Sequence, residues 1–179
     1  MRYWKRALIV SVLALPAVAL LGDEPPNKTT SPGALVKTWP EDPKEQVKPG
    51  PIDKDAPQAF KTTKSGLKYR ILRKGAKAKP SGTDIVTVRY KGWLSDQTIF
   101  GTSYRTKKKN AFPLKRVMQG WTEGMQLLGV GGMIELEVPA KLGYGKRGMK
   151  RGKKQLVPPN ARLHFIIELF DMEQEIKIM

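Results

Sequence analysis

Short runs of alternating apolar and polar residues fill the chain from about residue 61 onward, and they constrain its fold more than any other feature. Leu67, Tyr69 and Ile71 alternate with basic residues, and Val86 to Tyr90 alternates in the same way. A period of two is typical of strands with one buried face. The pattern predicts strands over 67–73, 86–90, 98–104, 112–114, 133–138 and 162–172. Pro113 assigns its short strand to a sheet edge, because proline cannot donate a ladder hydrogen bond.

One helix is expected inside this strand-rich region. It covers residues 119–128 and is ended by three closely spaced glycines, Gly129, Gly131 and Gly132. Strands with one central helix predict an α+β domain, in which a twisted antiparallel β-sheet wraps around one short α-helix. We assign this domain to residues 61–175, and a region of about 115 residues is large enough to fold alone.

Residues 1–22 have the composition of a secretory signal peptide. Three basic residues lie within the first six positions, an apolar run covers residues 7–22, and Ala17 to Ala19 forms a small-x-small cleavage pattern. We expect cleavage near Ala19 or Gly22 and export to the periplasm or cell envelope of a bacterium. Retention of the segment as a membrane anchor is the alternative. The chain has no cysteine, so its core must be stable without disulfides.

Residues 23–60 differ from the rest of the chain in composition. They carry eight of the 14 prolines, few large apolar residues and no periodicity. Such a segment buries too little surface to offset its chain entropy, so we predict a disordered linker. Trp39 is interpreted as a loosely held surface aromatic within it, and contact with the domain or a partner is the alternative.

Positive charge is concentrated in the second part of the chain. The formal net charge is +17, of which residues 61–179 contribute +16, whereas residues 23–60 carry −2. Clusters at Lys107–Lys109 and Lys146–Lys154 indicate contact with polyanions such as lipid headgroups or envelope polymers. A basic surface that only aids solubility is at least as good an interpretation, and we expect no obligate nucleic acid. One histidine and no cysteine also argue against a metal site.

Several aromatic residues suggest an apolar ligand pocket. Trp121 opens the predicted helix and can form a pocket floor, with Tyr90 and Phe100 as walls. Glycines on both sides of Tyr144 favour a tight turn that presents its ring. Residues of this kind are also common in ordinary cores, so the rings alone leave both interpretations open.

Six ordered motifs resemble the FKBP-type peptidyl-prolyl cis-trans isomerases over residues 62–173. They are Val86-Thr87-Val88-Arg89-Tyr90-Lys91-Gly92, Thr98-Ile99-Phe100, Phe112-Pro113-Leu114, the run from Val117-Met118-Gln119-Gly120-Trp121 to Gly124, Leu142-Gly143-Tyr144-Gly145, and Val157-Pro158-Pro159-Asn160 continuing to Phe165. The resemblance implies the same α+β fold, proline-containing polypeptides as clients, macrolide-type ligands and no cofactor. It also implies which residues act, with Tyr90, Phe100, Met118, Trp121, Tyr144 and Phe165 as catalytic and Phe112, Val117, Leu156 and Val157 as substrate-binding.

The reaction that the resemblance implies explains why such a pocket has no nucleophile. Rotation about an X–Pro amide faces a resonance barrier of about 18–20 kcal/mol. The planar amide is more charge-separated than the twisted transition state, so transfer from water to an apolar pocket destabilises the ground state more. By resemblance, Trp121 underlies the prolyl ring, the Met118 N–H holds the carbonyl before the proline, and the Tyr144 hydroxyl holds another carbonyl.

Three departures from the family pattern bear on activity. Gly101 stands where the family has an aspartate that accepts from a pocket hydroxyl and orients an arginine. Asn110 replaces the first aromatic of a pair that ends at Phe112. The loop from Tyr144 to Pro158 is about four residues longer than in compact members and basic, which suggests selection of acidic clients. Gly101 and Asn110 favour the alternative of a weakly catalytic or non-catalytic proline-peptide-binding or chaperone module, held on anionic surfaces by its basic domain.

A second motif is rejected. Gly143, Gly145 and Gly148 match the spacing of a dinucleotide-binding fingerprint. That site needs a helix after the last glycine, and the following residues contain Gly152 and soon meet two prolines.

Overall fold

The computed structural model describes residues 39–174. Its strands are β1 (Lys61–Thr62), β2 (Lys68–Arg73), β3 (Ile85–Leu94), β4 (Ile99–Thr102), β5 (Asn110–Pro113), β6 (Met133–Val138), β7 (Met149–Arg151), β8 (Lys154–Val157) and β9 (Leu163–Glu173). One α-helix, α1 (Gln119–Met125), and three short 3-10 helices, η1 (Leu114–Arg116), η2 (Ala140–Leu142) and η3 (Gly145–Arg147), complete the described elements.

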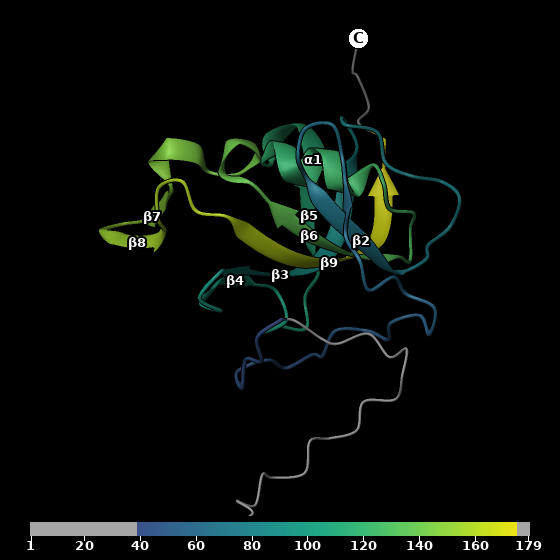
Figure 1. The fold of residues 1–179 in the computed structure, drawn as a ribbon. Coiled ribbons are helices and arrows are strands. Elements are labelled where there is room, and N and C mark those ends of the chain that lie inside the picture. The colour runs from purple at the N-terminus through teal and green to yellow at the C-terminus, as the bar shows by residue number, and fades with distance from the viewer. Residues whose placement is uncertain (1–38, 175–179) are drawn as a thin grey trace, which may run out of the picture. The chain divides into compact units, whose positions relative to one another are not determined.

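Seven of these strands form one antiparallel sheet. Its order is β1-β2-β6-β9-β3-β4, and β5 also pairs with β3. The long strands β3 and β9 lie in the middle, and α1 packs against one face of the sheet, as Figure 1 shows. β7 and β8 form a separate hairpin that extends from the body of the domain. The predicted α+β architecture of an antiparallel sheet around one helix is therefore confirmed.

The predicted elements are all present, with shifted ends. The helix ends at Met125 rather than at residue 128, because Leu127 and Leu128 donate to carbonyls three residues back in a tightened turn. β1, β7 and β8 had not been predicted. They are two to four residues long and carry many charged side chains, so they lack the apolar alternation that identifies longer strands.

The face of the sheet toward α1 carries the larger core. Leu136, Phe165 and Ile167 come from alternate positions of β6 and β9 and are buried against the helix. The helix approaches β6 closely through Gly120 and Gly124. A Cβ atom on Gly120 would lie 2.5 Å from a Val138 methyl carbon, so a larger residue would push the helix off the sheet.

The opposite face of the sheet is covered by residues 39–60, which we term the N-terminal strap. Trp39 is only 6% exposed and packs with Leu72, Trp93 and Tyr104 in a second apolar cluster. The backbone N–H groups of residues 46 and 47 both donate to the Tyr104 carbonyl, and that of Asp53 donates to the Leu72 carbonyl. The prediction of a disordered linker was therefore wrong for residues 39–60, as was the interpretation of Trp39 as a loose surface aromatic.

Ion pairs explain why so polar a segment is ordered. Lys91 Nζ lies 2.7 Å from Glu45 Oε1, with both side chains almost fully buried, and it also donates to the Pro40 carbonyl at 2.8 Å. Asp42 accepts from Arg105 Nε at 2.6 Å. Burial opposes ionisation of Asp42, but the hydrogen bonds from the Lys44 N–H and from Arg105 outweigh it and lower the pKa of the carboxyl.

Glu168 on β9 joins the strap to the sheet. Its carboxylate accepts from the Gly50 N–H at 3.2 Å, from Arg73 at 2.8 Å and from the buried Tyr104 hydroxyl at 2.9 Å. Burial, together with the charge of Glu168, raises the pKa of Tyr104, so this hydroxyl stays a donor. The strap is thus an integral layer of the domain.

The predicted signal peptide and the first part of the predicted linker lie outside the described residues. Within residues 39–174, no helix has the length and apolar character needed to cross a membrane.

Candidate functional site

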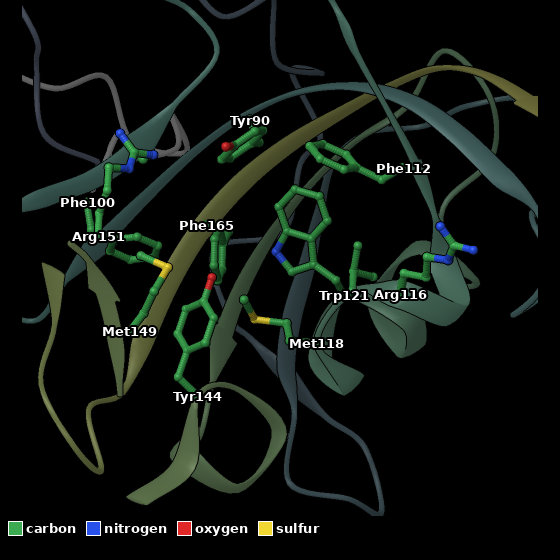
Figure 2. A pocket seen from close by; sticks show the side chains of 12 residues that line it. Tyr90, Phe100, Phe112, Arg116, Met118, Trp121, Tyr144, Met149, Arg151 and Phe165 are labelled. Carbon is green, nitrogen blue, oxygen red and sulfur yellow. The ribbon is translucent and has the colours of Figure 1, made fainter. Parts of the chain in front are cut away.

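A pocket of about 320 Å³ opens on the helix side of the sheet (Figure 2). This volume is at the lower end of the range for small-ligand sites. The residues that line it come from β3, β4, β5, η1, α1, β7, β9 and the segments beside them: Tyr90, Phe100, Gly101, Phe112, Arg116, Val117, Met118, Trp121, Tyr144, Met149, Arg151 and Phe165.

Five aromatic rings of this lining pack against one another edge to face. Trp121 is central, with ring centroids 5.1 Å from Tyr90, 5.8 Å from Phe112 and 5.4 Å from Phe165. Phe100 extends the series, 5.5 Å from Phe165. Edge-to-face geometry is favourable for aromatic quadrupoles. The rings therefore form a pre-organised apolar wall and floor that a ligand does not need to rearrange.

Local sequence explains how these rings converge. Trp121 lies in the first turn of α1, where it is 4% exposed and points back toward β3 and β9. Gly92 on β3 is paired with Phe165 on β9. A Cβ atom on Gly92 would lie 2.6 Å from Phe165 and 2.7 Å from Phe100, so only glycine lets both rings rest on the strand.

Three polar groups at the pocket have no hydrogen-bond partner among the described residues. The indole N–H of Trp121 is buried without an acceptor, and Figure 2 shows it on the side of the indole that faces Phe165 and Tyr144. The hydroxyl of Tyr144 and the backbone N–H of Met118, which precedes α1, are likewise unpaired within residues 39–174. Buried donors are nearly always paired in folded proteins, so the buried indole N–H of Trp121 indicates a site for a ligand with an acceptor. Tyr144 and Met118 are half-buried in the same lining, where a ligand can reach their donors.

The tyrosine hydroxyls stay protonated at neutral pH. Burial raises the pKa of Tyr90, partly offset by the positive charge of Arg151. Burial also raises the pKa of Tyr144, and the neighbouring Tyr90 adds to the effect. Both hydroxyls can therefore donate to a carbonyl oxygen of a ligand.

Most residues predicted for the site lie together in the lining. Tyr90, Phe100, Phe112, Val117, Met118, Trp121, Tyr144 and Phe165 all contribute to it. Leu156 and Val157 are not among the lining residues, and Val157 is buried in the main core instead.

Three lining residues were missed by sequence reasoning as members of the pocket, namely Arg116, Met149 and Arg151. Met149 and Arg151 lie two residues apart on β7, and the hairpin of this strand brings both to the pocket. Their two-residue spacing was the available signal, but it becomes informative only once the loop is known to be a hairpin. Arg116 ends η1 at the other side of the rings.

Gly101, noted above for the missing aspartate, lies in the lining beside Tyr90. A Cβ atom at this position would lie 3.7 Å from the Tyr90 hydroxyl oxygen, in ordinary contact. A side chain therefore fits there, and its absence leaves the Tyr90 hydroxyl without an acceptor among the described residues.

No group of three potential metal ligands gathers within residues 39–174. The three glycines with dinucleotide-like spacing are followed by β7 rather than by an α-helix, so a helix terminus for a pyrophosphate is missing there.

The fold and the ring-lined pocket are those of a known protein family. Residues 76–170 match the model of the FKBP-type peptidyl-prolyl cis-trans isomerases, and the chain belongs to that family. The resemblance identified from the motifs, and the FKBP-like fold that it implied, are confirmed.

Individual relatives are similar over the same region. The chain is 42% identical over 117 residues to the FKBP-type peptidyl-prolyl cis-trans isomerase FkpA of Aeromonas hydrophila, covering 65% of this chain and 42% of that protein. It is 39% identical over 110 residues to the outer membrane protein MIP of Legionella longbeachae, covering 62% and 46%. The crystal structure of FkpA from Escherichia coli superposes with a TM-score of 0.60 at 38% identity, covering 64% and 52%. The chain thus spans less than half the length of these two curated relatives.

Proposed function

We propose that this chain is a peptidyl-prolyl cis-trans isomerase that accelerates rotation about X–Pro bonds of polypeptide clients. The observation that carries the proposal is the pocket itself, five interlocked rings with unpaired donors directed at the space between them. A proline ring is an apolar, compact group that suits such a floor. The carbonyls beside it supply the acceptors that the donors lack.

Catalysis in this proposal uses no covalent step. The prolyl ring rests on Trp121, which removes the X–Pro amide from water. Burial destabilises the planar, charge-separated amide more than the twisted transition state, in which the resonance is lost. The Met118 N–H and the Tyr144 hydroxyl hold substrate carbonyls, so the peptide on one side of the proline stays fixed while the other side rotates.

Assistance to protein folding in a bacterial envelope is part of the same proposal. Isomerisation of X–Pro bonds is slow enough to limit folding, so an enzyme of this class is useful wherever exported chains fold. The signal-like residues 1–22 support export, and one relative is described as an outer membrane protein. Whether the leader is cleaved or anchors the chain changes the position of the enzyme but not its chemistry.

A second candidate is a proline-peptide-binding module with little catalysis. Gly101 favours it, because the Tyr90 hydroxyl lacks the carboxylate acceptor that the family places at this position. A less rigidly oriented hydroxyl holds the substrate less firmly, which weakens catalysis more than binding. The basic clusters add contact with anionic surfaces as a further property of this candidate.

A protease-coupled isomerisation assay tests the proposal and separates the two candidates. The intact chain is added to succinyl-Ala-Leu-Pro-Phe-p-nitroanilide with excess chymotrypsin, which cleaves only the trans form. We expect the slow phase to accelerate in proportion to the chain concentration. A slow phase equal to the uncatalysed rate would reject the enzyme, and binding of the same peptide in that case would support the module.

A further inference from the structure

We infer that this pocket selects peptides in which a carboxylate flanks the proline, and that Arg116 and Arg151 are the specificity-determining residues. The inference rests on the proposed function, since it names the substrate class of the same site. Figure 2 shows the two arginines at opposite ends of the ring cluster. No aspartate or glutamate occurs among the described residues that line the pocket.

Arg151 is directed at the pocket by the hairpin that carries it. Met149 and Arg151 of β7 both line the pocket, whereas Lys150 between them does not. Arg151 is paired with Lys154 in the β7–β8 ladder, which fixes the position of its backbone. Its charge acts on Tyr90, because the guanidinium offsets part of the pKa increase that burial gives the hydroxyl.

Neither pocket arginine forms an ion pair with a residue in the described part of the chain. Four other arginines do so: Arg70 with Glu135, Arg73 with Glu168, Arg105 with Asp42 and Arg162 with Glu137. Arg89 and Arg147 also lack an ion pair among the described residues, but neither lines the pocket, so Arg116 and Arg151 are the unpaired guanidinium groups that a pocket ligand can reach. At the pocket the neutralising carboxylate is left to the ligand.

Gly101 strengthens this inference. A carboxylate attached there would lie beside the Tyr90 hydroxyl and within the region where Arg151 acts. With glycine, both the hydroxyl donor and the guanidinium remain available. A glutamate or aspartate side chain next to the bound proline can accept from both groups at once.

The size of the expected preference follows from partial exposure. Both arginines are exposed residues, so a carboxylate gains a charge-assisted contact that water and salt weaken. Exposed pairs of this kind correspond to a preference of about two- to fivefold for glutamate over glutamine at low salt. The preference should fall toward one as sodium chloride is raised, since glutamine keeps the size but not the charge.

Exchange NMR spectroscopy on the intact chain tests the inference without a coupling protease. Two peptide pairs carry Glu or Gln either directly before or directly after the proline, and a Leu-Pro peptide reports general activity. We expect at least one Glu peptide to exceed its Gln partner in kcat/KM, mainly through KM. Equal rates in both pairs, with clear catalysis of the Leu-Pro peptide, would overturn the inference and leave the proposed function intact. No catalysis of any peptide would reject both.

Variants then assign the preference to the two arginines. Arg151→Gln and Arg116→Gln should each reduce the Glu-to-Gln ratio, and the double variant should bring it to about one. Lys153→Gln is the matched control, because it removes the same charge from the turn of the same hairpin outside the lining. Gly101→Asp should also reduce the ratio, since its carboxylate competes for Arg151. An unchanged ratio in the double variant, or an equal loss in Lys153→Gln, would show a general charge effect and contradict the assignment.

Discussion

The two faces of one sheet use polar groups in opposite ways. On the strap face, buried charged groups are paired, as Lys91 is with Glu45 and Arg73 with Glu168. On the helix face, the pocket has an unpaired indole N–H on Trp121 and an unpaired hydroxyl on Tyr144 among the described residues. The strands β3 and β9 supply side chains to both faces at alternate positions.

The difference separates what stabilises this domain from what can bind a ligand. A buried polar group without a partner costs free energy, so an unpaired group in a pocket lining, such as the Trp121 indole N–H, marks a place where another molecule can complete it. Paired groups on the strap face therefore contribute to stability, and unpaired groups on the pocket face mark the site. Substitutions on the strap face should change the free energy of unfolding, and substitutions of the unpaired pocket groups should change activity.

Removal of the strap should have the largest effect. A chain that begins at residue 61 exposes the apolar cluster of Trp93, Tyr104 and Leu72 and leaves Lys91 without its buried partner. We expect this chain to lose cooperative thermal unfolding by circular dichroism. A chain that begins at residue 39 is the control and should unfold cooperatively. Equal melting curves for the two would mean that the strap is not part of the folding unit.

The second-largest effect is expected when one partner of the buried Lys91–Glu45 ion pair is removed. Glu45→Ala leaves the buried Lys91 ammonium without its carboxylate and with the Pro40 carbonyl as a neutral acceptor, so the free energy of unfolding should fall by about 3–5 kcal/mol. Asp55→Ala is the matched control from the same strap, because its pair with Lys74 is exposed to solvent. We expect no measurable change there in urea unfolding. Similar losses for both variants would contradict the distinction between buried and exposed pairs.

A pair of tyrosine variants compares the two faces most closely. Tyr104→Phe removes a buried hydroxyl that donates to Glu168, and should cost about 1.5–3 kcal/mol of stability with little change in kcat/KM of the folded protein. Tyr144→Phe removes a hydroxyl without a protein partner. It should leave stability within about 0.5 kcal/mol and lower kcat/KM by about two- to tenfold. A loss of activity in Tyr104→Phe together with a loss of stability in Tyr144→Phe would contradict this division between the two faces.

The pH dependence of stability should show the smallest effect. Burial lowers the pKa of His164, which stacks on Trp93 at the strap face, despite the opposing influence of Glu137 and Glu135. The unfolded chain then binds a proton more readily than the folded one below about pH 6.5, the ordinary value for histidine. Stability is therefore fully present above that pH and declines as the pH falls through the lowered pKa. His164→Gln should reduce the difference in melting temperature between pH 8 and pH 5.5. An unchanged difference would show that His164 is not the source of the pH dependence.

Much of the pocket could be predicted from sequence because its residues belong to regular elements. Strand alternation fixes which side of β3 carries Tyr90, and the single helix fixes Trp121 near it. The resemblance of the motifs identifies eight of the residues that line the pocket. Local pattern and pocket geometry agree here because the core of the domain and the floor of the site are the same residues.

The strap could not be predicted because its composition resembles that of a disordered segment. Its contacts are long-range, such as the burial of Trp39 and the pairing of Glu45 with Lys91. A sequence does not reveal that a lysine in the middle of β3 is buried until its distant partner is known. Arg151 was missed for a related reason, since its charged hairpin lacks the apolar alternation that marks a strand.

The central claim is that proline peptides bind at the ring cluster on the helix face and not on the strap face. A ¹H–¹⁵N spectrum of the intact chain resolves each tryptophan indole N–H, and Trp121→Phe and Trp93→Phe variants assign the two signals. Titration with an X–Pro peptide should shift the Trp121 indole signal, whose N–H is unpaired at the pocket, and leave that of Trp93 unchanged. A saturating peptide that leaves the Trp121 signal in place, or shifts only the Trp93 signal, would contradict the claim.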